Sequence, residues 1–286
     1  LDFYPGKSGR TFEGQILEIL TDRWIKATET KSDRYPGLPF ETEGLDSIQT
    51  RKKTYQKFVK DFLRCAAAID DNIGKMLDYL KENNLEENTV VIYTADQGYF
   101  LGEHGMMDKR MFLEESLRMP FVIKYPKEIP AGKRIDDIIL NIDFPSLLLD
   151  YAAISQPDSF QGMSFRQNLM LDTPSDWRKH MYYRYYAHAK NRPSHMGIRT
   201  NKYKLIFYYG HPLGLKGTYT KETTTPAWEF YDLENDPMEL SNQYNNIKNK
   251  IIISQLKKDL LSLRTELGDA QTDTYQLKEI LKNYWE

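Results

Sequence analysis

The chain has 286 residues, of which 40% are hydrophobic and 28% are charged, and its formal net charge is −2. This composition is typical of a folded domain and excludes a disordered chain, which has fewer apolar residues and more net charge. The charge balance argues against duplex nucleic acid as a partner, and no apolar run approaches the roughly 20 residues that span a bilayer. The one cysteine, Cys65, excludes an internal disulfide framework and a cysteine-built zinc site.

The first half of the chain opens on irregular sequence, in which a short amphipathic helix is predicted over 12–25. Residues 53–83 carry apolar side chains at helical spacing, which predicts a long helix that ends at Asn83-Asn84. Cys65 lies on the apolar face of this helix, and we therefore expect it to be a buried structural thiol.

An α/β pattern follows the long helix. The β-branched run 89–94 predicts a buried parallel strand, 121–125 predicts a second strand, and 138–151 looks helical. The order helix, strand, loop, strand, helix is typical of an α/β sheet flanked by helices.

The second half of the chain changes character after about residue 161. Aromatic segments separated by turns predict a small antiparallel sheet, with a tight hairpin at Asn201-Lys202. A helix predicted over 248–267 would pack on this sheet. The sequence therefore predicts two domains, 1–165 and 166–286. The predicted strands of the sheet are 181–186, 196–200, 203–209 and 228–232.

The segment 94–120 carries the residues that are suited to catalysis or ligand binding. It leaves the carboxyl end of a predicted strand, where ligands bind in open α/β sheets. Asp96 and Gln97 offer adjacent oxygen donors, which suit a hard divalent cation such as calcium or magnesium. Lys109 and Arg110 supply positive charge suited to an oxyanion. Three glycines allow the backbone to turn tightly near a ligand: Gly98, Gly102 and Gly105.

Each of these residues also has an ordinary structural interpretation. An aspartate after a strand, such as Asp96, is commonly a cap or turn residue. The pair Lys109-Arg110 is by itself most often a solvated face, and a lone His104 is more often structural than catalytic. The combination of all of them favours a functional site.

That combination resembles a known family. The run from Thr94 to Pro120 is similar to the second signature region of type I sulfatases, members of the alkaline-phosphatase superfamily, and to bacterial members that act on 6-sulfated N-acetylglucosamine. The resemblance extends from about Tyr55 to Asn242. Further segments that match the family in order are Asp70–Gly74, Asn141–Pro145, Gln161–Ser164, Gly197–Thr200, Tyr203–Ile206 and Trp228–Leu233 with Asp236-Pro237.

The resemblance implies a C-terminal part of a sulfatase-type mixed or parallel sheet, plus an antiparallel subdomain with a packed C-terminal helix. It implies that Asp96 and Gln97 are two calcium ligands and that Lys109 contacts the sulfate group, with Arg110 beside it. His104, in a Gly-x-His-Gly turn, is either a substrate contact and candidate acid or a structural residue. His195 is expected to contact the sugar.

The family's nucleophile is a formylglycine made in the motif Cys/Ser-x-Pro/Ala-x-Arg. Cys65 is followed by Ala-Ala-Ala-Ile, which lacks the arginine, and no serine fits. We therefore expect the chain to be the C-terminal half of a sulfatase that acts on a sulfated carbohydrate. The missing N-terminal half would supply the formylglycine and the rest of the calcium site, and the chain alone would have little or no activity.

Two other functions remain open at this point. One is a superfamily phosphodiesterase or phosphonate hydrolase, and the other is a non-catalytic glycan-binding relative of the sulfatases. Leu1-Asp2-Phe3 shows no targeting signal. A secreted or periplasmic location is therefore expected from the family resemblance alone.

Overall fold

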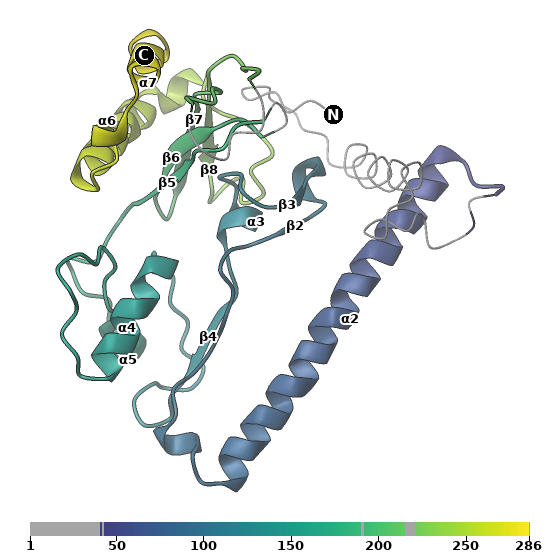
Figure 1. Cartoon of the computed structure of the whole chain (residues 1–286), viewed down its shortest axis with the longest axis vertical. Coiled ribbons are helices and arrows are strands. Elements are labelled where there is room, and N and C mark those ends of the chain that lie inside the picture. Colours follow the sequence, from purple (N-terminus) through teal and green to yellow (C-terminus); the bar gives the residue numbers. More distant parts are fainter. Residues whose placement is uncertain (1–40, 42, 190–191, 215–220, 286) are drawn as a thin grey trace. The chain divides into compact units, whose positions relative to one another are not determined.

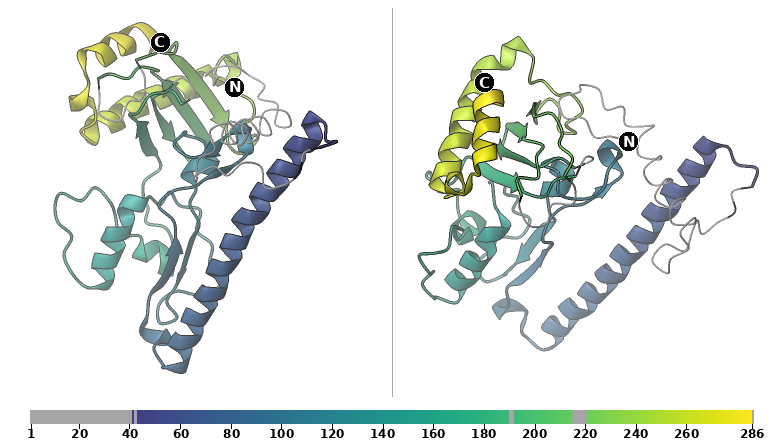
Figure 2. Two further views of the ribbon diagram at one scale, coloured as in Figure 1. Left: turned by 45° about the vertical axis from the view of Figure 1, so that its right-hand side comes forward. Right: turned by 45° about the horizontal axis from the view of Figure 1, so that its top comes forward.

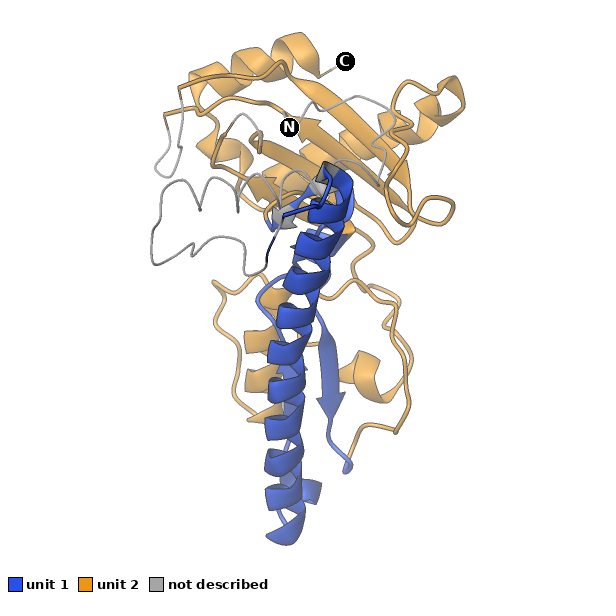
Figure 3. Cartoon of the chain, turned by 90° about the vertical axis from the view of Figure 1, so that its right-hand side faces the viewer, with its two compact units in different colours: residues 1, 10–109, 115–127 blue, residues 2–9, 110–114, 128–286 orange. Residues whose placement is uncertain are grey.

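The computed structural model describes residues 41, 43–189, 192–214 and 221–285 (Figure 1). The helix predicted over 12–25 lies outside these residues. The chain divides into two compact units (Figure 3): unit 1 contains 10–109 and 115–127, and unit 2 contains 110–114 and 128–286. The predicted domain boundary at residue 165 stays a prediction. None of the described helices is both long enough and apolar enough to cross a membrane.

Unit 1 begins with helix α2, Ser47–Glu82. Asp46 caps its N-terminus by accepting a hydrogen bond from the Gln49 backbone N–H (2.8 Å), while the Gln49 side chain accepts one from Asp46 N–H (3.1 Å). This reciprocal pair satisfies two amides that a helix start leaves open. Asn83 ends the helix, and Asn84 follows with φ +57°. The long helix predicted from periodicity is therefore confirmed.

The expected burial of Cys65 is wrong, because its side chain is exposed. Its neighbours on α2 show the reason, since large apolar side chains remain 40–55% exposed at Phe62, Leu63, Ile69 and Met76. The described residues place no packed layer over this face of the helix.

Strands β1, Val91–Thr94, and β4, Phe121–Lys124, form a two-stranded sheet in unit 1. They pair antiparallel, with Ile92 opposite Ile123. The prediction of a buried parallel strand over 89–94 is therefore not met: among the described residues β1 pairs antiparallel, and it is only half-buried. A continuous apolar run indicates burial on both faces only when both faces are covered.

Unit 2 contains the four-stranded antiparallel sheet that the aromatic segments predicted, in the order β5-β6-β7-β8. The predicted hairpin is confirmed, because β6 and β7 pair with Ile198 opposite Leu205. Strand β7 is the most buried, since every residue after its first is buried. The strands are β5 Met181–Tyr185, β6 His195–Arg199, β7 Tyr203–Tyr208 and β8 Ala227–Asp232.

Two C-terminal helices cover this sheet (Figures 1 and 2). Helix α6, Lys250–Glu266, was predicted, while α7, Tyr275–Tyr284, was not. Leu260 and Leu277 are fully buried in the shared core. The Trp228 indole on β8 donates a hydrogen bond to the carbonyl of the last α7 residue at 2.9 Å, which fixes α7 against the sheet.

A smaller substructure of unit 2 is organised by the buried carboxylate of Asp143. Its oxygens accept hydrogen bonds from Leu140 N–H (2.7 Å) and Met163 N–H (2.9 Å), and the Arg178 guanidinium binds both oxygens. A Cβ at Gly162 would lie 1.9 Å from a backbone oxygen of the turn before Asp143. Two of the matching sequence segments therefore form one structural unit.

The remaining elements are short. Helices α3 Glu114–Leu117, α4 Phe144–Tyr151 and α5 Arg166–Met170 accompany strands β2 Phe100–Leu101 and β3 Met107–Asp108, and 3-10 turns lie at 86–88, 103–105, 141–143, 247–249 and 270–272.

Candidate functional site

The turn after β1 carries the predicted metal ligands, and both lie in unit 1. The Gln97 amide donates a hydrogen bond to Asp96 Oδ2 at 3.0 Å, and the Asp96 side chain is 78% exposed. This hydrogen bond, together with the charge of Lys109, holds the pKa of Asp96 below its ordinary value. The aspartate is therefore ionised and accessible at neutral pH.

Lys109 reaches the same turn through a hairpin. Strands β2 and β3 pair with Phe100 opposite Asp108, so that the chain returns immediately before Lys109. Lys109 Nζ lies 3.8 Å from Asp96 Oδ2. Three residues predicted from the sequence are thus brought together, namely a carboxylate, an amide and a cation.

The turn has little steric freedom because Gly98 packs against backbone. Its N–H donates to Ser116 O at 3.0 Å, and a Cβ at this position would lie 2.1 Å from Glu115 O and 2.7 Å from Arg118 O. Only glycine fits so close a backbone approach. Gly98 and the segment 115–118, both within the matching run 94–120, therefore pack on one another.

His104 lies at the tip of the hairpin with a fully buried side chain. Its backbone is left-handed, with φ +56°, and its Nε2 lies 3.3 Å from Glu115 Oε2. The ring meets Phe100 edge-on, with centroids 6.1 Å apart. The buried ring therefore faces a carboxylate, and the predicted contact with a substrate stays a prediction.

The other two predicted site residues belong to unit 2. The Arg110 carbonyl accepts a hydrogen bond from the Tyr183 hydroxyl at 2.9 Å, and Arg110 has φ +98°. His195 is fully buried among tyrosine rings, and its Nδ1 lies 2.7 Å from Pro193 O. Burial lowers the pKa of His195 to about 4, so the ring is neutral at physiological pH. Their roles toward a substrate stay predictions.

A buried ion network in unit 2 was missed by the sequence reasoning. Lys204 Nζ lies 2.8 Å from Glu114 Oε1 and 2.6 Å from Glu239 Oε1, and the Lys204 side chain is inaccessible to solvent. Arg199 adds two hydrogen bonds to the Glu114 carboxylate, at 2.9 and 3.0 Å. Lys204 and Arg199 stood in the matching segments, but sequence alone assigned them no partner.

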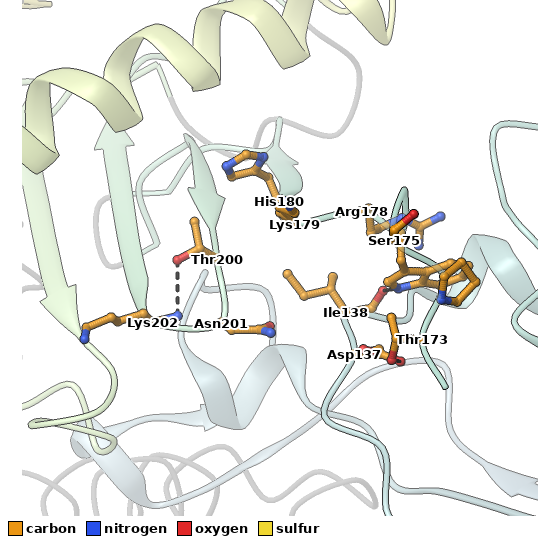
Figure 4. Close-up of a pocket in the computed structure, with 12 residues that line it drawn as sticks. Asp137, Ile138, Thr173, Ser175, Arg178, Lys179, His180, Thr200, Asn201 and Lys202 are labelled. Carbon is orange, nitrogen blue, oxygen red and sulfur yellow. Dashed lines mark hydrogen bonds between the residues drawn. The ribbon is translucent and has the colours of Figure 1, made fainter. Parts of the chain in front are cut away.

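A separate hollow of about 400 Å³ in unit 2 lies between the loop 173–180 and the hairpin at 200–202 (Figure 4). Cations line it, but most are neutralised. Arg178 binds Asp143, and Lys202 Nζ lies 2.5 Å from Glu234. This hollow is consequently a weaker candidate for an anion site than the turn that carries Asp96.

Asp96 and Gln97 fit calcium by the chemistry of their donors, because calcium binds carboxylate and amide oxygens. They supply two of the six to eight oxygens that such an ion takes. Among the described residues, no group of three or more His, Cys, Asp or Glu side chains is arranged to hold a metal.

Comparison with known proteins defines the class. The family model of N-sulphoglucosamine sulphohydrolase, C-terminal, matches residues 102–266, and the sulfatase family model matches residues 21–154. The chain therefore belongs to the sulfatases, as the resemblance predicted, and its mixed α/β fold is that of the alkaline-phosphatase superfamily.

Among its relatives is an N-acetylglucosamine-6-O-sulfatase from Bacteroides thetaiotaomicron, which is 40% identical over 249 residues, or 86% of this chain and 41% of the relative. A solved structure of a protein in complex with its substrate D-glucosamine-2-N,6-O-disulfate has a TM-score of 0.71 and 35% identity, covering 87% of this chain and 47% of that one. The chain thus spans less than half the length of these relatives.

The fold by itself does not separate sulfatases from other enzymes. A phosphonate monoester hydrolase from Silicibacter pomeroyi has a TM-score of 0.63 at 19% identity, covering 91% of this chain and 50% of that one. At this identity the similarity concerns the fold alone, and function must be argued from the site.

Proposed function

We propose that this chain is the C-terminal part of a glycan sulfatase that removes a sulfate ester from a sulfated amino sugar. The observation that carries the proposal is the position of Lys109 Nζ, 3.8 Å from Asp96 Oδ2, on a turn where Asp96 is exposed and ionised. A cation beside an accessible pair of oxygen donors suits a sulfate group bound next to a metal ion.

The residues of this chain would bind and orient the ester. Lys109 would donate a charge-assisted hydrogen bond to a sulfate oxygen, and Asp96 and Gln97 would be two of the ligands that hold a calcium ion. Bound calcium supplies positive charge that stabilises the sulfate oxygens. The nucleophile would come from a formylglycine upstream of this chain. His104 stays a candidate acid, and Arg110 and His195 stay candidate substrate contacts.

The substrate class is supported by the relatives. One is named for N-acetylglucosamine 6-O-sulfate, and another was solved with a disulfated glucosamine. A 6-sulfated glucosamine unit is therefore the substrate that we propose to test first. A secreted or periplasmic location stays a prediction from the family resemblance.

We infer that an upstream segment of the same protein completes the structure. Large apolar side chains on α2 are exposed, including Leu63 and Ile69, and Val122 on β4 is 64% exposed. Among the described residues, β1 and β4 form a sheet of two strands, which leaves one edge of each strand available for pairing. The matching relatives are more than twice as long as the match, which supports such a segment.

The test compares the chain alone with the chain joined to its upstream region, using 6-sulfated N-acetylglucosamine and a phosphonate monoester. We expect sulfate release by the longer protein, little or none by the chain alone, and a loss of about 100-fold or more in Lys109→Ala. Lys75→Ala, an exposed lysine of α2, is the matched control. Preferential phosphonate hydrolysis, or glycan binding without turnover, would replace this proposal by one of the two alternative functions.

A further inference from the structure

The hairpin β2–β3, residues 100–108, is too small to hold itself in place. Each strand has two residues, paired Phe100 with Asp108 and Leu101 with Met107. An isolated two-stranded hairpin is marginally stable at best in water. Its geometry must therefore depend on what its base and its tip contact.

The base of the hairpin is attached to the segment Glu115–Arg118. Gly98, two residues before Phe100, donates its N–H to Ser116 O at 3.0 Å and leaves no room for a side chain against Glu115 O. This contact fixes the turn that carries Asp96 on the same segment.

The tip approaches the same segment through the His104 side chain, with no hydrogen bond between the ring and Glu115. His104 Nε2 lies 3.3 Å from Glu115 Oε2, the His104 side chain is fully buried, and that of Glu115 is 16% exposed. His104 is held in a left-handed backbone conformation, at φ +56°, which is strained for a non-glycine residue. A fixed ring contact is a reason for such a conformation to persist.

The hairpin ends directly at the residue that the proposed function needs. Asp108, the last residue of β3, has φ +79°, and the next residue is Lys109, which approaches Asp96 to 3.8 Å. Lys109 directly follows the second strand, so a displacement of that strand from its docked position would move Lys109 relative to Asp96.

We propose that Glu115 is a positioning residue: by holding His104 it keeps hairpin β2–β3 docked and sets Lys109 beside Asp96. The inference rests on the proposed function only for its catalytic consequence, since the docking itself is a property of this chain.

The first experiment measures docking in the chain as it stands, with no substrate. Glu115→Gln keeps the size of the side chain and removes its charge. We expect the amides of residues 99–109 to exchange with deuterium about tenfold faster, while exchange in β6 and β7 is unchanged. Glu87→Gln, at an exposed glutamate of unit 1, is the matched control. Unchanged exchange over 99–109 in Glu115→Gln would overturn the proposal.

The second experiment is a double-mutant cycle in the complete sulfatase. Glu115→Gln should lower kcat/KM about tenfold when Lys109 is present, but less than about twofold in the Lys109→Ala background. A residue that acts only through Lys109 has nothing left to position once that lysine is gone. If the losses in kcat/KM of the two single variants multiply fully in the double variant, Glu115 acts independently of Lys109 and the proposal is overturned.

The two experiments fail in different ways. If the complete wild-type protein releases no sulfate, the proposed function fails, while hydrogen exchange still decides whether Glu115 docks the hairpin. If exchange responds to Glu115→Gln but the cycle is fully additive, the proposed sulfatase function stands and the positioning role is wrong.

Discussion

Lys204 Nζ lies 2.8 Å from Glu114 Oε1, and neither the lysine side chain nor its second partner, Glu239, has exposed surface. The ammonium thus lies between two carboxylates inside unit 2, and Arg199 supplies a second cation beside Glu114. Removing one member of a buried ion pair leaves the remaining charges without compensation, which costs far more than the net stability of the pair.

Lys204→Met is therefore expected to lower the free energy of unfolding by about 3–5 kcal/mol. The measurement is urea unfolding followed by circular dichroism. Lys202→Met is the control, since Lys202 pairs with Glu234 at the surface and such pairs contribute about 1 kcal/mol or less. Similar losses for the two variants would contradict the buried network.

Stability is expected to fall in acid as Glu114 becomes protonated. Burial by itself would raise the pKa of Glu114, but Lys204 and Arg199 outweigh it and lower the pKa from 4.5 to about 2. Because the folded-state pKa is depressed, the contribution is complete above about pH 4.5 and is lost as pH falls towards 2. At about 1.4 kcal/mol for each tenfold change, it amounts to about 3 kcal/mol.

Glu114→Gln tests this expectation. The variant should lose stability at pH 6, and its difference from wild type should shrink by about 3 kcal/mol between pH 4.5 and pH 2. Urea midpoints across this range give the comparison, and parallel curves for the two proteins would rule out the ionised Glu114.

His195 gives a second pH dependence in a different window. Burial lowers its pKa from 6.5 to about 4, and Nδ1 is held 2.7 Å from Pro193 O. The unfolded chain takes up the proton first, so stability is expected to fall as pH drops from 6.5 to 4, by about 3 kcal/mol. His195→Phe should remove this loss. Nitrogen NMR should show one neutral tautomer down to about pH 5, and a ring that titrates near 6.5 would contradict it.

Gly197 on β6 is expected to tolerate no side chain. A Cβ there would lie 2.6 Å from two ring carbons of Phe112 and 2.6 Å from Leu205 O, and the Phe112 ring stacks on Tyr183 at 5.2 Å. Gly197→Ala should therefore cost about 1–3 kcal/mol in thermal or urea unfolding. Phe112→Ala should remove part of that cost, because it removes the ring.

The matched control for this glycine is Gly74 in α2, where a Cβ would meet nothing within 4 Å. Gly74→Ala should stabilise the protein by about 0.5–1 kcal/mol, since alanine loses less entropy in a helix. A similar loss of stability at both positions would contradict the close packing of Phe112 against Gly197.

Local patterns predicted most elements of this protein. Helical spacing located α2, and aromatic segments separated by a turn at Asn201-Lys202 located β6 and β7. Helix α7 was missed, although its apolar residues have helical spacing and Thr274 caps it. The pairing of β1 was also missed, because strand direction depends on a partner that the local sequence does not name.

Only part of the candidate site was predicted, because local sequence does not name the distant partners of a residue. Residue type and order singled out Asp96, Gln97 and Lys109, and the structure brings these three together. The partners of Glu114 were not predicted. A contact between residues 85 or more positions apart, such as Glu114 with Arg199, leaves no periodic trace in one sequence.

The sequence by itself thus determined the helical and strand segments, the chemistry of the turn and the family, because each follows from residue identity and short spacing. Only the tertiary structure decided that Cys65 is exposed, that His195 is enclosed by aromatic rings and that Lys204 joins two buried carboxylates. Burial and charge pairing arise from packing between distant segments, and their free energies depend on which groups meet away from water.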